Sequence, residues 1–211
     1  MRTIAFAARK GGASKTTLTA HLAVEAARVT SKPVVMMDTD PQQSLTSWWD
    51  DREAAEPKLV AADLATLADE VKRLRSVEGM LFIDTPPLEA ATIEQVISVA
   101  DLVVIPVKPS PHDLKGVGVT VKMAKSQGKP FVFIVTQAVI RATLTTQAVL
   151  ALSQHGPVAT TIMQYRVDYA GAMTDGRVVQ ELDPKGKAAE EIRSLWDYVS
   201  TQLRTDVEVS A

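Results

Sequence analysis

The sequence contains no cysteine among its 211 residues, and only 5% of its residues are aromatic. Without thiols the chain can form no disulfide, no Cys-ligated zinc site, no iron–sulfur cluster and no thiol nucleophile. The three histidines, His21, His112 and His155, lie far apart without metal-ligand spacing, which argues against a zinc site as well. The core must therefore consist mainly of Val, Ile, Leu, Ala and Met.

Long apolar runs are also missing. No run approaches the roughly 18 residues that cross a bilayer. The first residues meet charge and glycine too soon for a signal peptide. No linker or repeat divides the chain, so we predict a single domain over residues 1–211. These absences predict a cytoplasmic protein without a membrane partner.

Acidic residues are absent from one long segment, residues 114–167. This acid-free segment holds six of the 23 basic residues: Lys115, Lys122, Lys125, Lys129, Arg141 and Arg166. The rest of the chain holds the other 17 basic residues and all 25 acidic residues. The formal net charge of -2 therefore divides into +6 and -8. Such polarisation suits a nucleic-acid surface, although the same lysines could be spread over solvated helix faces.

Short apolar runs alternate with helical patterns along the chain. We predict strands at residues 3–8, 33–38, 80–84, 102–107 and 131–136, and a weaker one near 158–162. The helical patterns lie at residues 15–29, 62–75, 89–99, 114–126, 143–155 and 188–203. This alternation predicts an α/β fold, a doubly wound, mostly parallel sheet with helices on both faces. Ligands of such folds bind beyond the carboxyl ends of the strands.

A glycine-rich turn follows the first predicted strand and leads into a helix. We expect the backbone of this turn to bind phosphate groups: Lys10, Gly11, Gly12, Ala13, Ser14, Lys15, Thr16 and Thr17. In such a loop Lys15 reaches the phosphate oxygens, and the Thr16 hydroxyl is a ligand for Mg²⁺. The common GxxxxGK[ST] pattern is not met, because Arg9 and Ser14 stand at its two glycines.

Carboxylates follow the next two predicted strands. Asp38 and Asp40 come after residues 33–37, where they form either an acidic site near a phosphate or a polar turn that Asp38 caps. Asp84 ends the apolar run Leu81-Phe82-Ile83, an arrangement typical of a carboxylate that holds Mg²⁺.

Together these motifs resemble the ParA/MinD group of P-loop ATPases with a deviant Walker A motif. The resemblance rests on KGGxxK[ST], DTDPQ, DTPP, VKPSPHDL and the DPKGKAA stretch before the last helix, and it is strongest for the small ParF-like branch. It implies ATP and Mg²⁺ as cofactors, Lys10, Lys15 and Asp40 as catalytic residues, and an ATP-dependent homodimer. In that dimer Lys10 would reach the partner's nucleotide, and Asp40 would position the attacking water.

The resemblance also implies a function. It predicts an ATPase that binds nucleoid DNA without sequence preference and segregates plasmid or chromosomal DNA with a ParB-like partner. The first strand starts at residue 3, so we expect no N-terminal helix-turn-helix extension. We expect adenine contacts from Thr136 and Pro184, and DNA contacts from four basic residues: Lys122, Lys125, Arg141 and Arg166.

Three other functions share this chemistry or fold. One is an ATPase that positions a protein cargo. A second is a MinD-like ATPase on a membrane, which the acidic C-terminal tail disfavours. A third is a P-loop metabolic ligase of the dethiobiotin synthetase type, against which Lys10 and the DTDPQ motif argue.

Overall fold

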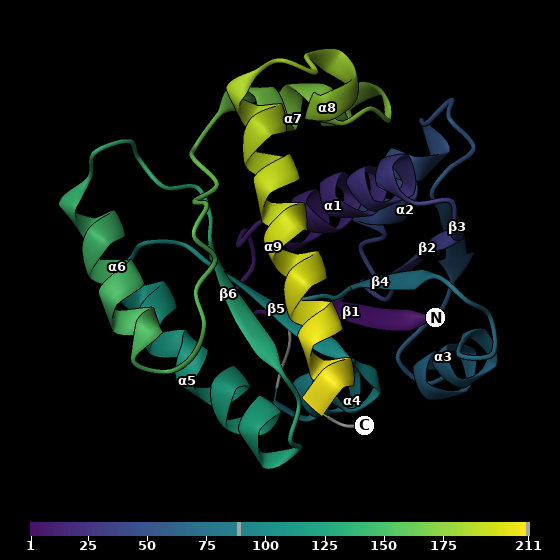
Figure 1. Cartoon of the computed structure of the whole chain (residues 1–211), viewed down its shortest axis with the longest axis horizontal. Helices are drawn as coiled ribbons and strands as arrows, with labels where there is room; N and C mark the ends of the chain where they lie inside the picture. The colour runs from purple at the N-terminus through teal and green to yellow at the C-terminus, as the bar shows by residue number, and fades with distance from the viewer. Residues whose placement is uncertain (88–89, 210–211) are drawn as a thin grey trace.

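Six parallel strands form the centre of the computed structural model, which describes residues 1–87 and 90–209 (Figure 1). In chain order they are β1 Arg2–Phe6, β2 Val34–Asp38, β3 Lys58–Ala61, β4 Met80–Asp84, β5 Leu102–Val107 and β6 Phe131–Val135. Their order in the sheet is β3-β2-β4-β1-β5-β6. Every residue of β2, β5 and β6 is buried, as continuous apolar runs predict for strands covered on both faces.

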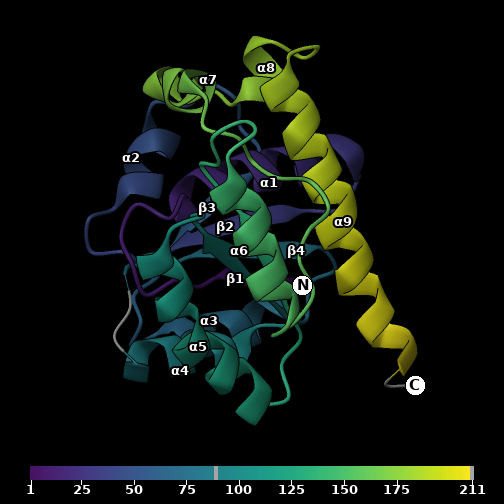
Figure 2. The ribbon, with the colours of Figure 1, turned by 90° about the vertical axis from the view of Figure 1, so that its left-hand side faces the viewer.

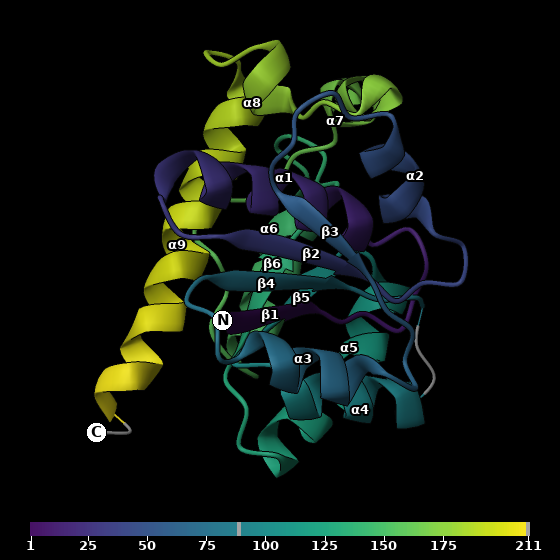
Figure 3. The ribbon, with the colours of Figure 1, turned by 90° about the vertical axis from the view of Figure 1, so that its right-hand side faces the viewer.

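Helices cover both faces of the sheet, which confirms the predicted doubly wound fold (Figure 3). One face carries α1 Lys15–Val29, α2 Ser44–Asp50, α7 Val167–Ala172, α8 Val179–Leu182 and α9 Lys187–Val209. A short 3-10 turn, η1 Met173–Asp175, joins α7 to α8. The long α9 packs beside α1 (Figure 2). The other face carries α3 Leu67–Leu74, α4 Ala90–Val99, α5 Pro111–Ser126 and α6 Thr143–Ser153.

Each face of the sheet has its own apolar core. Phe6 and Phe82 point from the strands toward α1 and α9, where they meet Leu18 and Trp196. On the other face Ile83 and Phe133 belong to the core that packs under α4 and α5. Both cores are rich in aliphatic residues, as the low aromatic content predicts. No helix in the described part of the chain is long and apolar enough to cross a membrane.

The predicted strand near residues 158–162 is wrong. This segment runs along the outer edge of β6 and makes only an isolated bridge between Phe133 and Val158. The Phe133 N–H donates to the Pro157 carbonyl at 2.9 Å, and the Ala159 N–H donates to the Phe133 carbonyl at 2.8 Å. The apolar residues of the segment are explained by packing without a regular strand, because Ala159 belongs to one core and Val158 and Ile162 pack against the other.

Several short elements were missed, and some helix boundaries differ. Strand β3 lies at the sheet edge and is only half-buried, so its sequence lacks a clear apolar run. The helix predicted at 62–75 begins only at Leu67, whereas α5 begins three residues early at Pro111 because Ser110 caps it. Glu89, where the helix predicted at 89–99 begins, lies outside the described residues.

Candidate functional site

The loop between β1 and α1 lies at the carboxyl edge of the sheet. It follows β1, which lies inside the sheet between β4 and β5. Gly12 and Ser14 both have left-handed backbones, with φ of 71° and 69°. The Leu18 N–H donates back to the Ser14 carbonyl at 2.9 Å, but the N–H groups of residues 15–17 have no acceptor in the described chain. Free N–H groups at the positive end of a helix dipole bind anions such as phosphate.

Lys15 lies buried beneath this loop, with only 6% of its surface exposed. Its Nζ lies 3.5 Å from the Lys10 carbonyl oxygen. Burial lowers the pKa of Lys15, and the carboxylates of Asp84 and Asp40 act in the opposite direction. A buried cation next to free N–H groups is the arrangement that phosphate oxygens require.

Thr16 and Asp84 meet below the loop, where the Thr16 hydroxyl donates to Asp84 Oδ2 at 2.6 Å. Asp84 is fully buried, and its Oδ1 has no hydrogen-bond partner among the described residues. Burial raises the pKa of Asp84 to about 7, although the hydrogen bond from Thr16 partly opposes this shift.

An unpartnered carboxylate oxygen beside a hydroxyl fits Mg²⁺, which prefers oxygen ligands and keeps several waters. No group of three or more His, Asp or Glu side chains in the described chain could hold a metal alone. The fit is therefore to a magnesium ion that Thr16 and Asp84 share with phosphate oxygens and water. When bound there, Mg²⁺ would neutralise charge that develops on the phosphate oxygens.

The two carboxylates after β2 have different surroundings. Asp38 accepts hydrogen bonds from the Asp40 N–H at 3.0 Å, the Thr46 N–H at 2.9 Å and the Thr46 hydroxyl at 3.0 Å. Asp38 therefore caps the turn and ties it to α2. Asp40 is half-buried, and among the residues that the structure describes its Oδ1 accepts only the N–H of Gln42, at 2.9 Å. Of the pair, Asp40 keeps a carboxylate oxygen for another partner.

Two further lysines lie at the loop. Lys10 is exposed, with its Nζ 4.0 Å from Asp113 Oδ2 at the start of α5. Lys108, which the sequence reasoning did not select, has its Nζ 3.3 Å from the position that a Cβ of Gly12 would take. A side chain at Gly12 would therefore crowd Lys108 as well as strain the backbone. The sequence signal that could have identified Lys108 is its place inside the VKPSP motif.

Thr136 is fully buried, and its hydroxyl donates to the Ala13 carbonyl at 3.2 Å. The Thr136 hydroxyl therefore supports the loop from below, and a contact between Thr136 and adenine stays a prediction. The next residue, Gln137, was not selected from the sequence. Its Nε2 donates to the Gly12 carbonyl at 2.8 Å and to Ser14 Oγ at 2.7 Å.

Pro184 is exposed on the loop between α8 and α9, where its carbonyl accepts a hydrogen bond from Arg193 at 2.9 Å. Its neighbours Asp183 and Gly186 line a cavity of about 670 Å³ that also borders α7. A contact between Pro184 and adenine stays a prediction.

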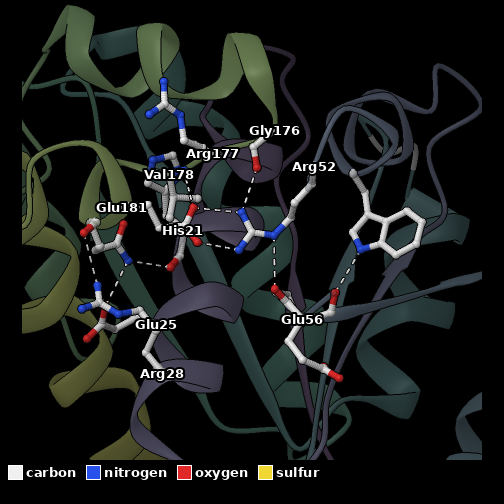
Figure 4. A network of polar contacts seen from close by, with 12 residues as sticks. His21, Glu25, Arg28, Arg52, Glu56, Gly176, Arg177, Val178 and Glu181 are labelled. Carbon is white, nitrogen blue, oxygen red and sulfur yellow. Dashed lines mark hydrogen bonds and ion pairs between the residues drawn. The ribbon is translucent and has the colours of Figure 1, made fainter. Parts of the chain in front are cut away.

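A partly buried ion pair between Arg52 and Glu181 anchors the chain just after α2, which follows the Asp40 turn (Figure 4). The Arg52 side chain is 3% exposed, and its two terminal nitrogens donate to the Glu181 carboxylate at 2.9 and 2.6 Å. Arg52 also donates to the Gly176 carbonyl at 2.8 Å. From α8, the Gln180 amide donates to the His21 carbonyl on α1 at 3.0 Å. The end of α2 and the helix after the phosphate loop are thus joined through α8.

The four predicted DNA contacts come from three parts of the chain. Lys122 and Lys125 are exposed on α5, and Arg141 is exposed in the turn before α6. Arg166 does not belong to a free surface, because it donates to the Glu191 carboxylate at 2.7 Å and its side chain is only 19% exposed.

Comparison with known proteins finds a family match over most of the chain. Residues 4–179 match the model described as the CobQ/CobB/MinD/ParA nucleotide binding domain. The maintenance of carboxysome distribution protein A of Halothiobacillus neapolitanus is 30% identical over 208 residues, which span 93% of this chain and 95% of that protein. A protein ParA of Rhizobium radiobacter is 34% identical over 116 residues, which span 54% of this chain and 51% of that protein.

Solved structures share the fold at low identity. Apo McdA from Cyanothece is similar with a TM-score of 0.78 at 17% identity, covering 94% of this chain and 99% of that one. The septum site-determining protein MinD of Pyrococcus horikoshii, complexed with Mg-ADP, gives 0.77 at 17% identity and covers 94% of this chain and 95% of its own.

Proposed function

The chain belongs to the CobQ/CobB/MinD/ParA nucleotide-binding family, and on that premise we propose that it is a DNA-associated partition ATPase. Members of the ParA/MinD group are ATPases, and this chain is an ATPase that binds ATP with Mg²⁺. The proposal concerns the steps beyond this chemistry: dimerisation, DNA binding and cargo.

The proposed switch is an ATP-dependent homodimer. Lys10 supports it, because its exposed ammonium group makes a 4.0 Å ion pair with Asp113, which is weak enough to exchange for a partner's phosphates. Asp40 supports the hydrolytic step, because its carboxylate is half-buried near Lys15 and keeps capacity to orient a water molecule. ATP binding would join two copies, and hydrolysis would separate them and release DNA.

The observation that carries the DNA proposal is a stripe of lysines on α5. Lys115, Lys122 and Lys125 are exposed and have no ion-pair partner among the described residues. Lys122 and Lys125 follow Lys115 by seven and ten residues, which places the three side chains near one face of the helix over a length of about 15 Å. Lysine contacts to phosphates supply most of the affinity for DNA of any sequence.

Charge reversal tests this surface. We expect Lys122→Glu/Lys125→Glu to weaken binding of random-sequence duplex DNA in the presence of ATP. Because each protomer then has two fewer lysines to neutralise phosphates, the slope of log K against log salt should shrink by about four in a dimer. Lys58→Glu/Lys72→Glu is the matched control, with the same charge change on exposed lysines of β3 and α3. An unchanged affinity and salt slope in the α5 variant would contradict the proposal.

For the cargo, we propose plasmid or chromosomal DNA bound by a ParB-like protein that stimulates hydrolysis. A protein cargo is the second candidate. It is favoured by the similarity to a carboxysome distribution protein over 93% of this chain, against 54% for the protein ParA.

The product of the neighbouring gene distinguishes the two candidates. It should be purified and tested for stimulation of ATP turnover in the presence of DNA. If it stimulates turnover and also binds a defined DNA site, DNA is the cargo. If it stimulates turnover and instead binds a protein assembly, the second candidate holds. In cells, a fluorescent fusion of the ATPase should coincide with nucleoid DNA, and the Lys10→Ala fusion should spread evenly.

A further inference from the structure

Ser14 occupies a backbone conformation that favours glycine. Its φ of 69° and ψ of 29° are left-handed, and its side chain does not cap α1. A residue with a Cβ is strained in this region, and the strain persists only where neighbouring groups hold it. Ser14 also stands where the common phosphate-loop pattern has its second glycine. Something in this chain must offset the strain.

Gln137 provides that offset from the end of β6. Its side-chain nitrogen has two N–H donors, and it contacts Ser14 Oγ at 2.7 Å and the Gly12 carbonyl at 2.8 Å. Thr136 adds a third bond, to the Ala13 carbonyl at 3.2 Å. Residues 12–14 of the loop are therefore each fixed by one of two adjacent residues more than 120 positions later in the chain.

We propose that Gln137 is a positioning residue for the phosphate loop and compensates for serine in place of glycine at position 14. With the Gly12 carbonyl and the Ser14 hydroxyl held by Gln137, the loop is set in the conformation that leaves its helix-start N–H groups free. Without the two hydrogen bonds from Gln137, strain at Ser14 drives the loop into conformations that bind phosphate poorly, and nucleotide affinity falls. The proposal rests on ATP binding by this loop and is independent of DNA, partner and cargo.

Four proteins test the compensation: wild type, Gln137→Ala, Ser14→Gly and the double variant. We expect Gln137→Ala to weaken ATP binding at least tenfold in the presence of Mg²⁺, by calorimetry. Ser14→Gly supplies the reference affinity for the double variant, because glycine adopts φ of 69° without strain. In the Ser14→Gly background, Gln137→Ala should weaken ATP binding less than threefold. Steady-state kinetics should show the loss in KM, with little change in kcat.

Two further measurements separate positioning from other roles. Gln137→Glu keeps the size of the side chain but lacks N–H donors, so it should fail as Gln137→Ala does. Inorganic triphosphate should lose as much affinity for Gln137→Ala as ATP does, because the loop binds phosphate. Gln154→Ala, an exposed glutamine at the end of α6, is the matched control and should bind ATP like wild type.

Three results would overturn the proposal. The first is wild-type affinity in Gln137→Ala. The second is an equal loss whether position 14 holds serine or glycine, which would mean a general structural role. The third is a loss for ATP but not for inorganic triphosphate, which would mean that Gln137 reads the base. If Gln137→Ala does not fold, Gln137→Glu and the double variant carry the same comparison.

Discussion

His21 should make the stability of this protein depend on pH in a way that one substitution removes. The side chain is fully buried on α1, its Nδ1 lies 2.7 Å from the Thr17 carbonyl, and its ring packs edge-on against Tyr169 at 5.4 Å. Its Nε2 has no partner among the described residues. Burial therefore lowers the pKa of His21 to about 4, below its ordinary value of about 6.5.

The magnitude follows from these two values. Because the folded pKa is lower than the unfolded one, the stabilising effect of neutral His21 is complete above pH 6.5 and is lost as the pH falls toward 4. Between pH 8 and pH 5 the loss is about 2 kcal/mol, and below pH 4 it reaches about 3 kcal/mol. Asp84, whose pKa is raised, acts in the opposite direction, because its stabilising effect is lost as the pH rises toward about 7.

The assay is urea unfolding of wild type and His21→Asn at pH 8 and pH 5, without nucleotide or Mg²⁺. Asparagine can still donate to the Thr17 carbonyl but cannot be protonated, and the cost of its smaller volume does not depend on pH. Any contribution of Asp84 cancels in the comparison. We expect the stability deficit of His21→Asn to shrink by about 2 kcal/mol between pH 8 and pH 5.

His112→Gln is the matched control, because His112 is exposed at the start of α5. It should leave the pH dependence of wild type in place. A constant difference between wild type and His21→Asn at the two pH values would refute the argument that His21 is buried in its neutral form.

The remaining predictions concern the nucleotide site and its anchor. Lys15→Ala should lose ATP binding by calorimetry, because the loop loses its buried cation; near-normal affinity would exclude that role. Lys10→Ala should bind ATP but fail to dimerise, and dimers equal to wild type by light scattering would count against the crossing lysine. Asp40→Ala should hold ATP and accumulate a DNA-bound dimer, whereas rapid turnover would remove Asp40 from catalysis. Arg52→Met should lower the free energy of unfolding by about 1–3 kcal/mol, because the half-buried Glu181 carboxylate loses Arg52 and keeps the Val178 N–H; adding Glu181→Met should recover part of this loss.

The sequence predicted the parts of the fold whose patterns are local. Continuous apolar runs predicted β1, β2, β4, β5 and β6, because a strand buried on both faces has no polar side to hide. The motifs after those strands predicted that Thr16 and Asp84 meet, because parallel strands bring their carboxyl ends to one edge. Strand β3 escaped prediction because its edge position leaves it half-exposed.

Other parts depend on contacts between distant residues, which no local pattern encodes. The ion pair between Arg166 and Glu191 joins residues 25 positions apart. The hydrogen bond from the Thr136 hydroxyl to the Ala13 carbonyl joins residues 123 positions apart. No motif surrounds Gln137 or Arg52 in the sequence. Their roles become visible only from the groups that they contact, which are Ser14 for Gln137 and Glu181 for Arg52.

The central position of β1 has a consequence for how the chain folds as it leaves the ribosome. Strand β1 is synthesised before the other five strands, yet its partners are β4 and β5, with Ile4 opposite Phe82 on one side and Leu102 on the other. About a hundred residues must therefore emerge before β1 is paired on both edges, and α9, which covers α1, comes last. Such long-range pairing slows folding and leaves apolar strands unpaired for longer. The β1–α1 segment, which we propose holds ATP, is therefore made before the strands and the helix that complete its surroundings.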